Sequence, residues 1–206
     1  MRGQSVAVAA SLVTACGACF PTYQSPRVEP RFHVDADAMA ISGHRVSYRV
    51  NGPDYMVTIT PAYGFGRRLE LGVPLGAYFG GSGQTYPVLL PYAKLALGNL
   101  DQPDHLAIVA QASGSVGVMV GHDRGTWEPQ AMLWHVASAG GQHGDFAFSS
   151  RYAQDNQSMM AAALGATFKR PERPAIEVGV LRNSYTTSGD HVLYDVFVRA
   201  KIGFLK

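Results

Sequence analysis

The sequence predicts an all-β protein: a single closed, antiparallel, up-and-down transmembrane β-barrel of about ten strands, within a range of roughly 8–12. Short runs with an apolar residue at every second position follow one another after residue 31, separated by clusters of Gly, Asn, Asp, Pro and Ser. Charged residues make up 16% of the 206-residue chain and apolar residues 47%, whereas a soluble domain has about 25% charged residues. No apolar run reaches the ~18 residues of a spanning helix, so a membrane could be crossed only by a closed barrel.

The alternating pattern divides the chain after residue 31 into ten candidate strands. They cover residues 32–40, 55–65, 69–79, 89–97, 106–120, 132–136, 146–152, 160–168, 176–180 and 192–204. The longest is LAIVAQASGSVGVMV, from Leu106 to Val120, whose apolar anchors all have even numbers, which predicts one strand of fifteen residues that projects beyond the bilayer. In the short sixth segment, Met132, Trp134 and Val136 are expected on the apolar face and His135 on the polar face.

Alternation alone leaves two orientations open, because a soluble calyx turns its apolar face inward and a transmembrane barrel turns it toward lipid. Strand length, aromatic residues near the strand ends and a polar face of small residues and balanced charges favour the transmembrane barrel. Such a lumen is expected to be plugged by paired charges. The expected lumen network consists of Asp35, Asp37, Glu70, Asp145, Glu177 and Asp195 with Arg68, Lys94, Arg151, Lys169, Arg199, Lys201 and His135.

The N-terminus is expected to direct export. Arg2 precedes an apolar run, and Val13-Thr14-Ala15-Cys16 resembles the bacterial lipobox. This divides the chain into a signal peptide (residues 1–15), a lipidated N-terminal tether (16–31) and a barrel domain (32–206), with Cys16 as the site of lipid attachment. The alternatives are cleavage near Ala18 without a lipid, an apolar N-terminus with no export role, and a redox or metal half-site at Cys16 and Cys19, for which no further cysteine exists.

Two stretches resemble bacterial outer-membrane β-barrel proteins. YGFGRRLELGV, from Tyr63 to Val73, is similar to a hairpin common in small barrels of this class, in which a Tyr-Gly strand end turns through a basic residue into an Arg-Leu-Glu-Leu-Gly strand. IEVGVLRN and the closing LYDVFVRAKIGF are similar in style to the last hairpin of the same group, although Leu205 and Lys206 follow the customary terminal aromatic residue. The resemblance implies the outer membrane of a Gram-negative bacterium and transfers no catalytic residue.

Topology suggests one candidate site. With both termini in the periplasm, loops at 42–54, 80–86, 121–127, 154–158 and 185–191 face outward, and turns near 66–67, 98–105, 139–143 and 170–174 face the periplasm. A shared outer rim could bind a metal or supply the Asp-His pair of a surface hydrolase. Its residues would be His44, His122, Asp123, Asp190 and His191. The alternative is that these are ordinary loop residues. His135 and Ser138 are expected on opposite faces, so they form no hydrolase pair.

The sequence therefore favours an outer-membrane barrel lipoprotein with a structural or interaction role, with no catalytic residue, metal site or cofactor identified. The expected partners are outer-membrane lipid and other envelope proteins, and a net charge of +2 gives no reason to expect nucleic acid. Two alternatives stay open: an outer-membrane hydrolase that uses the rim residues, and a soluble periplasmic calyx-type lipoprotein that binds an apolar ligand. The oligomeric state is open as well.

Overall fold

The computed structural model describes residues 25–42, 53–80, 85–112, 115–137, 158–168, 175–185 and 191–205, which form strands and turns. The strands are β1 (Arg31–Ile41), β2 (Asp54–Phe65), β3 (Leu69–Gly72), β4 (Leu75–Phe79), β5 (Thr85–Leu89), β6 (Tyr92–Leu97), β7 (Asp104–Gln111), β8 (Val116–His122), β9 (Trp127–Ala137), β10 (Ser158–Phe168), β11 (Ala175–Tyr185) and β12 (His191–Leu205). Within the described ranges, no helix is both long enough and apolar enough to span a membrane.

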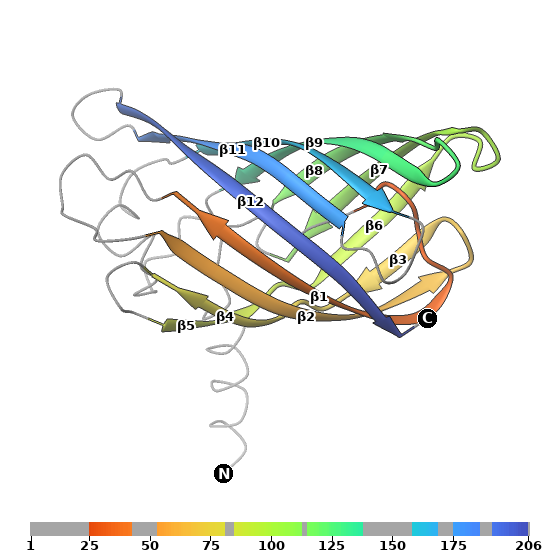
Figure 1. The fold of residues 1–206 in the computed structure, drawn as a ribbon, viewed down its shortest axis with the longest axis horizontal. Helices are drawn as coiled ribbons and strands as arrows, with labels where there is room; N and C mark the ends of the chain where they lie inside the picture. The colour runs from red at the N-terminus through yellow and green to blue at the C-terminus, as the bar shows by residue number, and fades with distance from the viewer. Residues whose placement is uncertain are drawn as a thin grey trace, which may run out of the picture.

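The sheet closes on itself (Figure 1), because β1 pairs with both β2 and β12. β3 and β4 both pair with β2 and continue one another as one wall strand, and β5 and β6 form a second such pair. Pro74 and Pro91 lie in the two breaks, where proline has no amide hydrogen for the ladder. The result is a closed antiparallel barrel of ten strands, which confirms the predicted all-β, closed-barrel architecture.

Apolar residues cover the outside of the barrel. Val57 and Ile59 on β2 are 47% and 54% exposed, and Ile108 and Val118 on β7 and β8 are 39% and 43% exposed. Their neighbours along each strand are buried toward the lumen, as the alternating burial of β2 and β8 records. The predicted outward orientation of the apolar face is therefore confirmed for these strands.

The prediction of one strand from Leu106 to Val120 is wrong. β7 ends at Gln111 and β8 begins at Val116, and the Gln111 amide donates to the Ser115 carbonyl at 2.9 Å. Leu106 pairs with Val120 and Ala110 with Val116, so both members of each pair have even numbers. Because the chain reverses without changing which parity faces outward, the alternation continues unbroken through the turn.

The predicted faces of the sixth segment are also wrong. Met132 and Trp134 are buried inside the barrel, whereas Leu133 and His135 are exposed on the outside. β9 begins at Trp127, and Glu128 is buried with the same parity as Met132 and Trp134. Large apolar side chains fill the lumen at this point, so the prediction that apolar residues of this segment face outward was wrong. The predicted strand at 146–152 lies outside the described residues, and β9 pairs directly with β10.

We call the end at which β1 starts and β12 finishes the tether end, and the opposite end the loop end. The tether end, on the right in Figure 1, carries residues 25–30 and the turns at 66–68, 98–103 and 123–126. The predicted outward placement of 121–127 is therefore wrong, because the unforeseen reversal after β7 moves it to the opposite end. β1, β4 and β11 finish at the loop end, where the predicted outer loops 42–54, 80–86 and 185–191 begin.

Candidate functional site

A layer of paired charges fills the lumen near the tether end. Lys94 Nζ on β6 lies 2.8 Å from Glu70 Oε1 on β3, and both side chains are nearly inaccessible. Lys201 Nζ on β12 lies 2.7 Å from Asp35 Oδ2 on β1. The His33 Nε2 atom lies 3.8 Å from both carboxylates and so connects the two pairs. Because an unpaired charge in such a site is costly, these pairs have to persist together.

A second charged group borders this layer around Arg199, which has no exposed surface. Its Nη1 lies 3.5 Å from Glu177 Oε2, and its Nε lies 3.8 Å from Asp37 Oδ2. The opposite side of the guanidinium is less polar, since Nη2 lies 2.8 Å from the Met39 sulfur and the Phe197 ring centroid is 5.4 Å away. Arg199 therefore lies where charged side chains give way to apolar ones.

An apolar layer occupies much of the described lumen toward the loop end, where Asp54, Gln111 and Ser115 are buried as well. Trp134 is completely buried, and its indole nitrogen donates to the sulfur of Met132. Gly117 on β8 makes room for this ring, because a Cβ atom there would lie 2.6 Å from Trp134 Cδ2. The cluster contains Met39, Ile41, Met56, Tyr78, Val88, Leu90, Tyr92, Ala107, Val109, Met119, Met132, Trp134, Ala161, Ala163 and Phe197.

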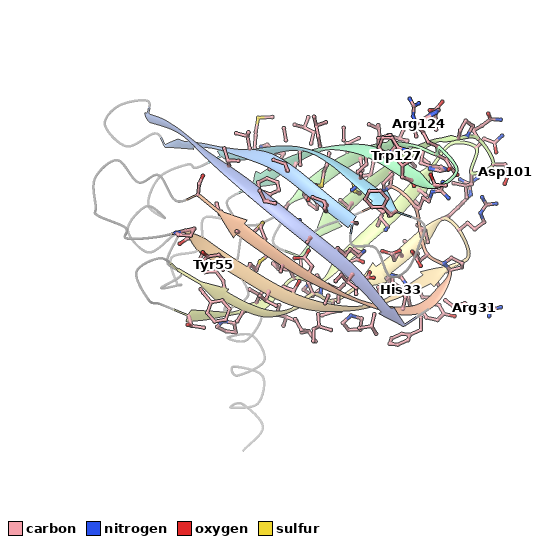
Figure 2. The ribbon with its side chains drawn as sticks, in the orientation of Figure 1. Arg31, His33, Tyr55, Asp101, Arg124 and Trp127 are labelled. Carbon is pink, nitrogen blue, oxygen red and sulfur yellow. The ribbon has the colours of Figure 1, made fainter. Side chains whose placement is uncertain are left out.

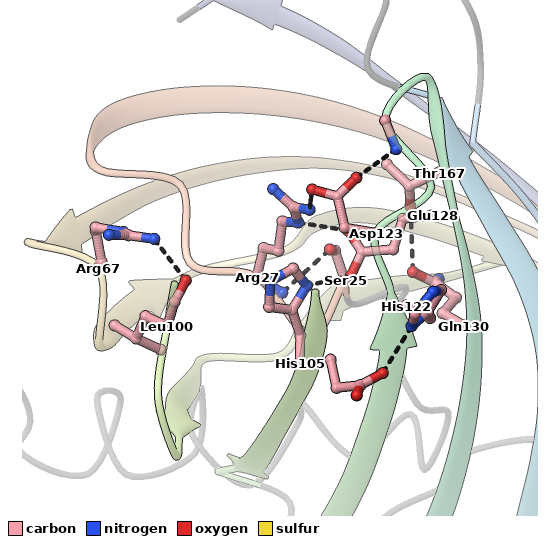
Figure 3. A network of polar contacts seen from close by, with 12 residues as sticks. Ser25, Arg27, Arg67, Leu100, His105, His122, Asp123, Glu128, Gln130 and Thr167 are labelled. Carbon is pink, nitrogen blue, oxygen red and sulfur yellow. Dashed lines mark hydrogen bonds and ion pairs between the residues drawn. The ribbon is translucent and has the colours of Figure 1, made fainter. Parts of the chain in front are cut away.

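Residues 25–30, which we call the plug, occupy the mouth of the barrel at the tether end. Arg27 Nε donates to Glu128 Oε2 on β9 at 2.6 Å, and Nη2 donates to Asp123 in the rim turn that precedes β9 (Figure 3). Val28 is buried, and the Glu29 amide donates to Glu70 Oε2 at 3.2 Å. The plug is thus bonded to opposite parts of the inner wall. An extended tether was expected at these positions, so the docked plug is a feature that the sequence did not indicate.

The electrostatics of the plug favour a permanent anchor. Burial lowers the pKa of Arg27, but the hydrogen bond to Asp123 and the charges of Glu128 and Asp123 outweigh burial and raise that pKa above its ordinary value. A cation with a raised pKa contributes its stabilisation at every pH below the ordinary pKa, so the Arg27 charge persists throughout the range in which proteins fold. Glu128 also accepts from the other side, since His105 Nδ1 lies 2.8 Å from its Oε1.

Most described members of the expected lumen network lie in the lumen. They are Asp35, Asp37, Glu70, Lys94, Glu177, Arg199 and Lys201. Arg68 is exposed in the turn at 66–68 and His135 is exposed on the outer wall, so both assignments are wrong. Asp145, Arg151 and Lys169 lie outside the described residues, and the side chain of Asp195 on β12 does too.

The expected rim residues do not share one rim. His122 and Asp123 lie at the tether end, whereas β12 begins with His191 at the loop end. His44 and Asp190 lie outside the described residues, as does the side chain of His191. The structure instead pairs His122 Nδ1 with Asp104 Oδ1 at 2.7 Å, across the ends of β7 and β8. Across the described ranges, no cluster of three or more His, Cys, Asp or Glu side chains could hold a metal ion.

Arg27 and Glu128 are the principal residues that sequence reasoning missed. Glu128 and Gln130 precede Met132 and Trp134 at the same parity, so two polar residues in that register could have identified the lumen face of β9. Arg27 had no such signal, because residues 25–30 have no periodicity. Comparison with known proteins adds no assignment: no protein-family model matches the chain, and no curated protein is significantly similar to it.

Proposed function

We propose that this protein is a lipoprotein of the bacterial outer membrane, with its barrel in the bilayer and a structural or interaction role. The outward apolar surface carries the proposal. Val57, Val118 and Val198 are each between 43% and 49% exposed, and Leu164 is 71% exposed. A soluble protein rarely exposes such a continuous apolar surface, whereas an apolar band around a barrel matches the hydrocarbon layer.

The dimensions of this surface support the proposal. The outward residues of β2 run from Tyr55 to Phe65, which is about 33 Å along a strand and ~25 Å along the membrane normal at the usual tilt of ~40°. The apolar band of outer-membrane barrels is ~25 Å high. Exposed aromatic side chains mark both borders, with Phe32, Tyr63, Phe65 and Trp127 at the tether end and Tyr55 and Phe79 at the loop end.

A filled lumen favours a role without transport. The apolar layer contains fully buried Trp134 and Phe197, and the charged layer below it is paired and covered by the plug. Barrels of about eight strands have interiors that side chains just fill, and aqueous channels need about sixteen strands. The protein is therefore proposed to present its two ends on a rigid, closed barrel. The hydrolase alternative needs all five predicted rim residues at one end, and His122 and Asp123 lie at the other end from His191.

The position of the plug supports a lipid anchor on Cys16. Residues 17–24 connect Cys16 to Ser25, and eight extended residues span up to ~28 Å. The plug lies at the mouth of the barrel at the tether end, and we place a lipid on Cys16 in the leaflet adjacent to that end. In this proposal the tether end faces the periplasm.

Detergent dependence tests the proposal. A chain without residues 1–19 should stay monodisperse only in detergent and should show a heat-modifiable band on gels, as closed membrane barrels do. A folded monomer that is soluble without detergent would support the calyx-type lipoprotein instead. The anchor has its own test: Cys16→Ser should abolish incorporation of labelled fatty acid, while Cys19→Ser should leave it unchanged.

A further inference from the structure

A groove of about 520 Å³ lies on the outer wall of the barrel near the tether end. Its apolar walls are formed by Leu106, Val120 and Leu164, from β7, β8 and β10. Ala131 on β9 pairs with both Val120 and Leu164, so a small side chain lies between two larger ones. The depression follows from this register, and its volume is within the ~300–1,000 Å³ of small-ligand sites.

The end of the groove nearest the barrel rim is polar. Asp104 and His122 lie there with their side chains 82% and 46% exposed, and they are joined by the 2.7 Å contact between Asp104 Oδ1 and His122 Nδ1. That contact uses one ring nitrogen, so the other, Nε2, is available to a ligand. The pair thus offers a carboxylate acceptor beside an imidazole whose Nε2 donates a hydrogen bond when both ring nitrogens carry a proton, directly next to the apolar walls.

A third polar group lies two residues beyond His122. Arg124 is exposed in the turn at 123–126, and its guanidinium makes no ion pair with any other described residue. Figure 2 shows Arg124 and Trp127 together at the tether end of the barrel. Trp127 is an outward aromatic residue at the border of the apolar belt, where indole rings meet lipid headgroups.

We propose that this groove binds one glycerophospholipid with a phosphoethanolamine headgroup. One acyl chain lies over Ala131 between Val120 and Leu164, the phosphate accepts from Arg124 and from the imidazolium form of His122, and the ammonium donates to Asp104. A choline headgroup has no N–H to donate to the carboxylate, and a glycerol headgroup has no cation, so the charges of this site favour phosphoethanolamine over both. The inference rests on the proposed insertion of the barrel in a membrane.

The proposed preference for a phosphoethanolamine headgroup can be measured as selective retention of one lipid by the barrel. The full chain would be reconstituted into nanodiscs with equal amounts of phosphatidylethanolamine, phosphatidylcholine and phosphatidylglycerol with identical acyl chains, then released and analysed by native mass spectrometry. One phosphatidylethanolamine should be retained roughly tenfold more often than either competitor, as expected for a hydrogen bond to a charged group. Asp104→Asn and Ala131→Phe should each remove the preference.

Matched variants separate the groove from the rest of the surface. Asp101→Asn changes another exposed carboxylate at the tether end. Ala162→Phe adds the same ring at an outward position on the neighbouring strand β10. Both should retain the lipid as the unmodified chain does. Equal retention of the three lipids by a barrel that inserts, or loss of preference in the two control variants as well, would overturn the inference alone. Failure to enter nanodiscs at all would overturn the proposed membrane barrel and the lipid site with it.

Discussion

Arg27 Nε lies 2.6 Å from Glu128 Oε2, although 101 positions separate the two residues in the chain. This contact joins the segment ahead of the first strand to the inner wall of β9. Glu128 is almost inaccessible and Arg27 is about one third exposed. The pair therefore lies at the boundary between solvent and lumen, and it holds the plug in the mouth of the barrel.

Replacing this arginine should release the plug. In Arg27→Ala, Glu128 and Asp123 lose their shared cation, and the expected loss is about 1–3 kcal/mol of docking free energy. Hydrogen exchange of the amides in residues 25–30 should become faster, while exchange within β9 stays slow. Arg67→Ala is the control, because Arg67 and its partner Asp101 are both largely exposed and such pairs contribute only ~0–1 kcal/mol. Unchanged exchange in Arg27→Ala would show that the plug is not held by this contact.

A lysine on the outer wall should oppose membrane insertion. Val118 lies outward on β8, near the middle of the apolar belt. Val118→Lys should cost about 2–4 kcal/mol of insertion free energy, the range for a cation facing lipid at mid-depth. Folding into lipid vesicles across a denaturant series measures this, with Asp101→Lys in the 98–103 turn as the control. Equal insertion by the two variants would count against lipid contact at Val118.

The plug and the apolar layer should each prevent ion conduction through the barrel. Neither the original chain nor Arg27→Ala should form channels in a planar bilayer, because the apolar layer still fills the lumen when the plug is released. Removing the rings in Trp134→Gly and Phe197→Gly together with Arg27→Ala should allow small ions to pass. Large stable channels formed by the unmodified chain would contradict the filled lumen.

Removing one partner of the Glu70–Lys94 ion pair should destabilise the barrel more than replacing both partners with uncharged residues. Lys94→Met leaves a buried carboxylate with the Tyr92 hydroxyl, 2.8 Å away, and the Glu29 amide as its remaining donors. We expect a loss of about 3–5 kcal/mol in the free energy of unfolding. Adding Glu70→Gln should recover most of that loss, since no unpaired charge then remains. Unfolding in micelles, followed by gel mobility, measures the coupling, and outward Leu95→Met should leave stability nearly unchanged.

Alternation predicted the barrel and the outward face of most strands, because a two-residue period records which side of a sheet is apolar. The same two-residue period gave wrong predictions where the odd or even number of a residue did not distinguish the alternatives. It could not detect the hairpin after Gln111, since the paired residues on both strands have even numbers. It also misplaced Trp134, because in a barrel whose lumen is partly apolar a large side chain is suited to either face.

The charged layer was largely predictable, and the plug was not. Asp35, Glu70 and Lys94 interrupt apolar strands at fixed parity, so their burial follows from the sheet. Arg27 reaches Glu128 only because the closed wall brings β9 opposite the start of β1. That proximity is a property of the tertiary structure, and no local pattern in residues 25–30 encodes it.

The pairing of β1 with β12 sets an order of events for assembly. The first and last strands meet only after the whole chain is available, so the wall stays open until β12 has been delivered. The plug precedes β1 and touches both β3 and β9 from within. It is most simply enclosed while the wall is still open, rather than threaded afterwards through a finished ring. Release of the plug from the completed barrel then requires breaking its hydrogen bonds at the mouth, while the pairing of β1 with β12 stays intact.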